Sequence, residues 1–206
     1  RDVAPSRGLG DVYKRQAKFV TLGADQQIDF GGIAKGYTGQ KLAELFQEYG
    51  VSSALVSLGG NIQAIGTKPD GSSWKVGIRD PKGGQQDYIG VLSVENQAVV
   101  TSGGYERYFE ENGETYIHII NPRTGYPADG DLLSVTIVSK DGTLADGMST
   151  ALYIMGYEKA CQFWRQHREE FNVILVTDDG KIHISENLKG NFQTEWELEM
   201  IESGSE

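Results

Sequence analysis

A carboxylate and two hydroxyls recur at helical spacing in the segment ADGMSTA, residues 145–151. At about 100° per residue, Asp146, Ser149 and Thr150 share one face of a helix, with an apolar stripe that includes Met148 and Leu152 opposite. Oxygen ligands of this kind suit Mg²⁺, which also keeps waters and takes ligand phosphates. A simpler role is a capping box, since the residue three before Asp146 is a threonine, and Asp146 would then only close its own helix.

Two paired-glycine turns each follow a predicted strand. The first lies in DFGGIAKGY, residues 29–37, and leads into a helix, so backbone N–H groups and the positive helix end can hold a phosphate beside the cation Lys35. The second is Gly59-Gly60, where Asn61 can donate and accept hydrogen bonds toward a ring or a ribose. Neither has Walker A spacing, and each taken alone also fits an ordinary structural turn.

One histidine is placed to act as a base. His118 alternates with Ile117 and Ile119, so it points away from their face, and it precedes a loop that contains Arg123. Such a histidine can serve as a general base. The alternative is an exposed strand histidine without a chemical role.

The remaining histidines and the single cysteine have weaker cases for chemistry. His167 lies in a charged helix end, and His183 alternates with two isoleucines and is predicted to be solvated. Cys161 stands beside two aromatic residues on a predicted helix and is expected to be a packing residue.

These positions require a mixture of helices and locally paired strands. Apolar periodicity predicts helices at 34–49, 144–155 and 158–167, the last two broken at Gly156. Alternation predicts strands at 19–22, 27–30, 54–58, 62–66, 74–78, 88–94, 98–101, 105–110, 115–120, 133–138, 172–177 and 181–185. The predicted class is therefore α+β, with mixed, largely antiparallel sheets and a few packed helices.

Charge and composition exclude several classes of protein. The 206 residues include 19 basic and 29 acidic side chains, for a net charge of −10, which argues against nonspecific nucleic-acid binding. No apolar run approaches the length of a membrane span. A single cysteine excludes an intrachain disulfide.

The two ends differ from the rest of the chain. Residues 1–16 are basic and aperiodic and lack the apolar core of a secretory signal, so they are expected to be a non-native or disordered leader. Residues 191–206 are expected to be an acidic tail that begins as a short strand, because Trp196, Leu198 and Met200 alternate with glutamates. The predicted domain spans residues 17–190.

Five segments, in this order, resemble the ApbE family: DFGGIAKGY, LVSLGGNI, TSGGYERYF, IHIINPRTGYP and ADGMSTALYIMG. Members are FAD:protein FMN transferases, formerly described as thiamine-biosynthesis lipoproteins. The resemblance implies an Mg²⁺-dependent enzyme that cleaves FAD, releases AMP and joins FMN by a phosphoester bond to a threonine of a redox flavoprotein subunit. It also implies that the intact protein is membrane-anchored and extracytoplasmic, at the periplasm or cell surface.

Carried onto this sequence, the resemblance also implies roles for particular residues. The metal ligands would be the Ala34 backbone carbonyl, Asp146 and Thr150, with Ser149 adjacent. His118 would be the base that activates the acceptor threonine. The residues expected at the flavin or its phosphates are Gly31, Lys35, Tyr37, Gly59, Gly60, Asn61, Ile120, Pro122 and Arg123.

The sequence departs from the family pattern in three ways. Aspartates are usual where Asn121 stands and near Gln40, and family members are longer at the N-terminus. We therefore expect an N-terminally truncated chain that binds FAD weakly by itself. Two other functions stay open: an FAD diphosphatase, if water replaces threonine, and a noncatalytic flavin-binding protein.

Overall fold

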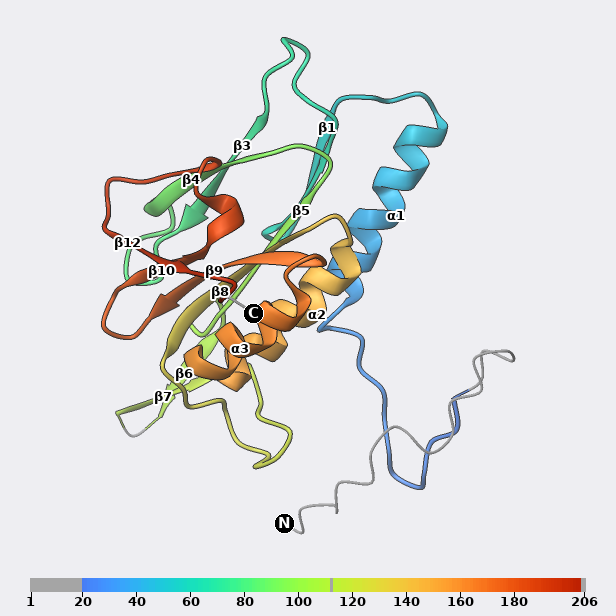
Figure 1. Cartoon of the computed structure of the whole chain (residues 1–206). Helices are drawn as coiled ribbons and strands as arrows, with labels where there is room; N and C mark the ends of the chain where they lie inside the picture. The colour runs from blue at the N-terminus through green and yellow to red at the C-terminus, as the bar shows by residue number, and fades with distance from the viewer. Residues whose placement is uncertain (1–19, 112, 205–206) are drawn as a thin grey trace.

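The computed structural model describes residues 20–111 and 113–204, so the leader predicted at 1–16 lies outside the described residues. Three helices are interspersed with short strands (Figure 1). The helices are α1 (Ala34–Glu48), α2 (Gly142–Met155) and α3 (Tyr157–His167). The strands are β1 (Ala54–Leu58), β2 (Asn61–Ile65), β3 (Trp74–Arg79), β4 (Tyr88–Val94), β5 (Ala98–Gly103), β6 (Tyr108–Glu111), β7 (Glu114–Ile117), β8 (Leu132–Ser139), β9 (Phe171–Thr177), β10 (Ile182–Ser185), β11 (Phe192–Gln193) and β12 (Leu198–Ile201).

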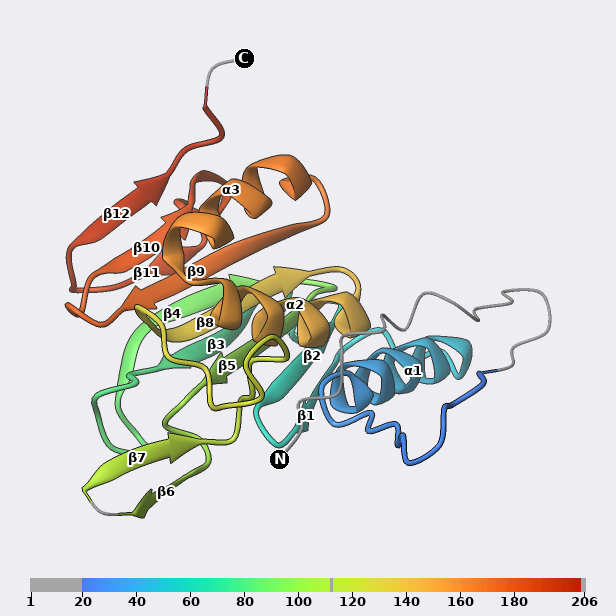
Figure 2. The same ribbon diagram turned by 90° about the horizontal axis from the view of Figure 1, so that it is seen from below.

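Seven of the strands form one sheet, in the order β1-β2-β5-β8-β9-β10-β12. Within it only β10 and β12 pair in parallel. A second sheet has the order β11-β4-β3, and β6 and β7 form a separate hairpin that projects from the body (Figure 2). The α+β prediction with largely antiparallel sheets is confirmed.

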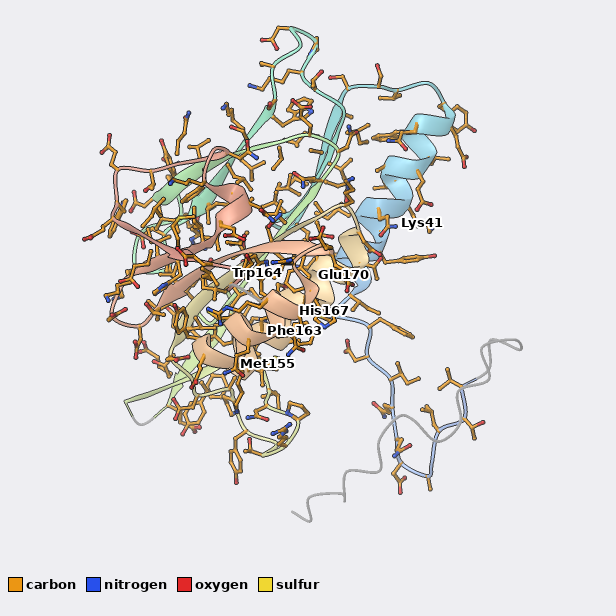
Figure 3. The ribbon with its side chains drawn as sticks, viewed as in Figure 1. Lys41, Met155, Phe163, Trp164, His167 and Glu170 are labelled. Carbon is orange, nitrogen blue, oxygen red and sulfur yellow. The ribbon has the colours of Figure 1, made fainter. Side chains whose placement is uncertain are left out.

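The large sheet is covered on both faces, so neighbouring residues on both sides of its central strands are buried. Along β9, Val173 and Leu175 pack with α2 and α3, whereas Ile174 and Val176 pack with the β11-β4-β3 sheet. On α3, the fully buried Trp164 donates from its indole nitrogen to the backbone oxygen of Phe171 at 3.1 Å (Figure 3). The two resulting cores fix the sheet that carries the candidate site.

The first predicted strands are wrong within the described residues. Residues 20–22 and 27–30 form no strand, and Val20 and Phe30 are 56% and 63% exposed. A strand needs a neighbour to satisfy its backbone groups, and none of the described strands pairs with this segment. Alternation in the sequence shows only that side chains could point to opposite faces of a strand. It does not show that a partner strand is present.

The end of the chain is built into the fold. Phe192 on β11 and Ile201 on β12 are 4% and 2% exposed, and each strand pairs with a sheet. The short strand expected within residues 191–206 is present, but the structured region continues past residue 190. The described glutamates of this segment are exposed, and Glu199 pairs with Lys181 at 2.8 Å.

His183 is buried, contrary to the prediction that it is solvated. Its side chain is 4% exposed, and its Nδ1 lies 3.1 Å from the hydroxyl of Tyr157 on α3. The alternation with the flanking isoleucines is real, but the second face of β10 is covered by a helix. Burial lowers the pKa of His183 below 6.5, partly offset by the carboxylate of Glu199.

Candidate functional site

The paired glycines at 31–32 lead into α1 through a tight backbone turn. The backbone nitrogens of Ile33 and Ala34 both donate to the oxygen of Phe30, at 3.0 and 2.8 Å. Within residues 20–111 and 113–204 no side chain caps the start of this helix, and its first turn contains no acidic residue. The positive end of α1 is therefore open to a negative group from elsewhere.

Asp146 supplies that negative group. Its Oδ2 accepts a 2.7 Å hydrogen bond from the backbone nitrogen of Gly36 in the first turn of α1. The capping-box interpretation of Asp146 is wrong, because Asp141 caps α2 instead and accepts from Leu144 N at 2.9 Å. Asp146 thus closes a different helix, from a buried position with 5% exposure.

The approach of α1 to α2 depends on glycine at their crossing. A Cβ on Gly36 would lie 2.1 Å from the backbone oxygen of Gly142 and 2.6 Å from Cβ of Asp146. Gln40, one turn later on α1, accepts from the hydroxyl of Thr143 at 3.1 Å. The amide at position 40 therefore joins the two helices that hold the carboxylate.

The polar face of α2 lies inward together with part of the apolar stripe. Ser149 and Leu152 are both fully buried. Strand β5 covers the polar face, and Ser102 Oγ on β5 lies 2.8 Å from Ser149 Oγ and 3.1 Å from Thr150 Oγ1. Ser102 was missed by the sequence reasoning, although it lies within the segment TSGGYERYF, because only the fold shows which strand faces α2.

The donor set fits a hard divalent cation. Asp146 is a buried carboxylate, and none of the ion pairs in residues 20–111 and 113–204 includes it. A buried charge of this kind is costly without a partner. In the same residues no three His, Cys, Asp or Glu side chains cluster, so an ion here would depend on hydroxyl and carbonyl oxygens beside Asp146. Of the predicted ligands, the fold brings Asp146, Ser149 and Thr150 together on α2, and Ala34 begins the helix that Asp146 contacts.

The second glycine turn lies against the start of α1. Gly59 and Gly60, between β1 and β2, have φ angles of 56° and 93°, which favour glycine. A Cβ on Gly59 would lie 3.9 Å from Cδ of Lys35. Asn61 is 6% exposed, and its side-chain nitrogen has no hydrogen-bond partner within the described residues. The fold thus gathers the predicted phosphate cation, the glycine turn and an unpartnered amide.

His118 lies just beyond β7 and is exposed, as the alternation predicts. Its backbone nitrogen and its Nδ1 both lie 3.1 Å from the backbone oxygen of Arg107. Because a carbonyl oxygen only accepts, Nδ1 must carry the proton, so the neutral ring leaves Nε2 as the basic nitrogen. The contact between Nδ1 and the Arg107 oxygen also fixes the orientation of the imidazole ring.

The loop after His118 is held by Asn121. Its backbone nitrogen donates to Tyr126 O at 2.8 Å, and its Oδ1 accepts from Arg123 N at 3.0 Å. Ile120 is 48% exposed at the entrance to this loop. The predicted contacts Pro122 and Arg123 are exposed on it.

The two remaining positions predicted to contact flavin are also exposed. Gly31 donates from its backbone nitrogen to Oδ1 of Asp29 at 2.5 Å. Tyr37 is 52% exposed on α1, with Lys41 Nζ 5.8 Å from the centre of its ring. Gly31 lies just before α1 and Tyr37 in its first turns.

Comparison with known proteins identifies the family. The chain matches the model of the ApbE family over residues 5–175, and it belongs to that family. The match begins within the segment set aside as a leader.

The matching relatives are described as FAD:protein FMN transferases or as ApbE proteins. The chain is 46% identical over 151 residues to the FAD:protein FMN transferase of Treponema pallidum (strain Nichols), covering 69% of this chain and 42% of that protein. It is 41% identical over 159 residues to one from Klebsiella pneumoniae (strain 342), covering 77% and 48%. The solved ApbE protein of Thermotoga maritima has a TM-score of 0.73 at 36% identity, covering 80% of this chain and 53% of that one.

A flavin transferase ApbE from Vibrio cholerae has a TM-score of 0.68 at 30% identity, covering 80% and 52%. The chain therefore spans about half the length of the relatives it matches. None of the helices in the described residues is long and apolar enough to cross a membrane.

Proposed function

We propose that this chain carries the metal and base centre of an FAD:protein FMN transferase. The observation that carries the proposal is the buried Asp146 carboxylate, which sits at the open end of α1 beside Ser149 and Thr150 without a basic partner among the described residues. Family membership supports FAD as the substrate.

Different residues of the chain would hold the metal and bind the phosphates. Asp146 and Thr150, with Ser149 and the Ala34 carbonyl nearby, would hold Mg²⁺, which when bound offsets the negative charge of a pyrophosphate. Lys35 and the glycine turn at 59–60 would bind the phosphates. Phosphoryl-type transfer depends on such positioning and charge stabilisation.

His118 would take the proton of the acceptor threonine. As the hydroxyl oxygen bonds to the phosphorus of the FMN half, the bond to the AMP phosphate breaks, AMP leaves, and the hydroxyl proton passes to Nε2. The Arg107 carbonyl keeps the proton on Nδ1, which leaves Nε2 free to accept.

Product analysis tests this proposal. The complete gene product is incubated with FAD and Mg²⁺, with and without a redox flavoprotein subunit, and free FMN and AMP are separated by chromatography. A transferase releases AMP without free FMN when the acceptor is present. Equal free FMN and AMP in both samples would indicate the diphosphatase, and no cleavage would indicate a noncatalytic flavin-binding protein.

We further propose that the complete protein acts outside the cytoplasm, held at a membrane by a lipid anchor, where its redox acceptors lie. The resemblance to the ApbE family supports this location. Fractionation of cells that express the complete gene, with and without globomycin-type inhibition of lipoprotein processing, tests it. Recovery in the cytosolic fraction would contradict it.

A further inference from the structure

A cleft of about 560 Å³ lies between β3 and the large sheet, where Leu55, Ile62 and Val99 form an apolar floor. Successive β5 residues show which face this is. Thr101 lines the cleft, whereas Ser102 bonds to α2 on the opposite face. The cleft therefore lies on the face of the sheet opposite Asp146, although the Gly59-Gly60 turn beside Lys35 also lines it.

Three basic side chains line this cleft, although the protein as a whole is acidic. Lys75, Arg79 and Arg107 form no ion pair within the described residues. Nε of Arg79 is buried and has no hydrogen-bond partner in the described part of the chain, and its guanidinium lies 4.7 Å from the centre of the Tyr105 ring. Glu106 is the acidic residue in the lining. Unpaired cations around an apolar floor favour an occupant that carries both negative and apolar groups.

The cleft also exposes the edge of a strand. Neighbouring residues in a strand point to opposite faces, yet five consecutive residues of β3, 75–79, line the cleft, so it borders the strand edge-on. In the order β11-β4-β3, no strand of the described residues lies next to this edge. Across the described residues, the backbone groups of 75–79 bond to no partner outside the pairing with β4. A free edge of this kind can accept an extended polypeptide.

One end of the cleft adjoins the candidate base. Arg107 lines the cleft with its neighbours Tyr105 and Glu106, and its backbone oxygen accepts the contacts from the nitrogen and Nδ1 of His118. A polypeptide that leaves the cleft at this end passes Arg107, the residue whose carbonyl holds the imidazole.

We propose that an extended acidic segment of the acceptor protein binds in this cleft as an added strand on β3 and so delivers its threonine to His118. The identity of the occupant as the acceptor rests on the proposed transfer function. Backbone pairing supplies affinity, and the basic side chains select acidic sequences and fix the position of the segment.

Peptide binding tests the proposal without requiring catalysis. The probe is a fluorescein-labelled peptide of alternating aspartate and valine with one threonine, and binding to the complete gene product is measured by fluorescence anisotropy. We expect Lys75→Gln and Arg107→Gln each to weaken binding by about five-fold, as for an exposed charge pair, and added salt to weaken it further. Lys159→Gln on α3 is the matched control and should bind the peptide as the unaltered protein does.

Two altered peptides test the mode of binding. Replacing aspartate by asparagine should remove the effect of both substitutions, and methylating alternate backbone nitrogens should abolish binding, because such a peptide cannot pair with β3. Equal binding of the methylated peptide, or absence of binding by the acidic one, would overturn the proposal.

FAD affinity, measured by calorimetry on the same variants, separates the alternatives. We expect Lys75→Gln and Arg107→Gln to leave it unchanged. A loss of FAD affinity with unaltered peptide binding would make the cleft part of the FAD site and overturn the proposal. The protein could instead bind the acidic peptide in a charge-dependent way but never cleave FAD. That result would contradict the proposed function and still support peptide binding in the cleft.

Discussion

At the scale of single residues, Asp146 has one structural role, closing α1, and one proposed chemical role, binding the metal. Its carboxylate closes α1 through Gly36, and it shares one face of α2 with Ser149 and Thr150. Asparagine at this position keeps the shape and an oxygen for Gly36 but removes the charge that a divalent cation needs.

We therefore expect Asp146→Asn to weaken Mg²⁺ binding, measured by titration calorimetry, by at least about ten-fold, with little change in melting temperature. The matched control is Asp141→Ala, which removes the true cap of α2. That variant should lose about 1 kcal/mol of stability and bind Mg²⁺ normally. Full Mg²⁺ affinity in Asp146→Asn would show that the carboxylate serves only to close α1.

His118 is the second residue whose role can be isolated. A positioned base contributes ~10²–10⁴-fold to a rate, so His118→Ala should lower FMN transfer by about that factor. FAD affinity should change little, and His167→Ala on α3 should change neither quantity.

The comparison of rate with affinity decides the role of His118. Equal losses of transfer rate and FAD affinity would make it a binding residue. An unchanged rate would make it an ordinary exposed histidine.

At the scale of elements, the crossing of α1 and α2 determines where Asp146 lies. A methyl group on Gly36 would collide with backbone, which cannot move aside as a flexible side chain can. Gly36→Ala should therefore cost about 1–3 kcal/mol of stability, as overpacking does, measured by urea unfolding. Gly32→Ala, where a Cβ meets nothing within 4 Å, is the control and should be nearly neutral. Equal stability of the two variants would contradict this close approach.

The contact of α3 with β10 and β12 gives the protein a pH-dependent stability. Burial beneath Tyr157 lowers the pKa of His183 below 6.5, so the unfolded chain takes up a proton more readily than the folded one. Well above pH 6.5, His183 is neutral in the folded and the unfolded chain, so it does not affect the free energy of unfolding. As the pH drops through 6.5 toward the lower pKa of the folded protein, the free energy of unfolding falls.

We expect the melting temperature to fall between about pH 7.5 and about pH 5.5, and the fall to be smaller in His183→Gln. The carboxylates with lowered pKa values, such as Glu199 and Asp179, titrate below this window. A His183→Gln profile identical to that of the unaltered protein would contradict the assignment.

Local patterns in the sequence predicted most elements but not their neighbours. The bounds of β1 and β4 and the break at Gly156 follow from alternation and from a glycine at φ 80°. Burial of His183 and the contact of Ser102 with α2 arise from elements distant in sequence, which no local period reports. The same limit explains the strands wrongly predicted at 20–22 and 27–30, where no partner strand is present among the described residues.

At the scale of the whole molecule, the two faces of the large sheet differ in chemistry, and the Gly59-Gly60 turn borders both, since it lies beside Lys35 on α1 and also lines the cleft. On one face, α1, α2 and β5 hold Asp146 and its hydroxyl neighbours; on the other, β3 and the large sheet enclose the basic cleft. His118 is tied through Arg107 to the end of that cleft. This arrangement suits a reaction that joins two substrates, one of them a protein.

The most direct test of the central claim is the intact mass of an acceptor subunit after incubation with the complete gene product, FAD and Mg²⁺. Our account predicts an acceptor heavier by one FMN, with the addition mapped to a threonine, absent when the metal is chelated and absent from an acceptor whose threonine is replaced by alanine. Cleavage of FAD with no change in the acceptor's mass would contradict the account.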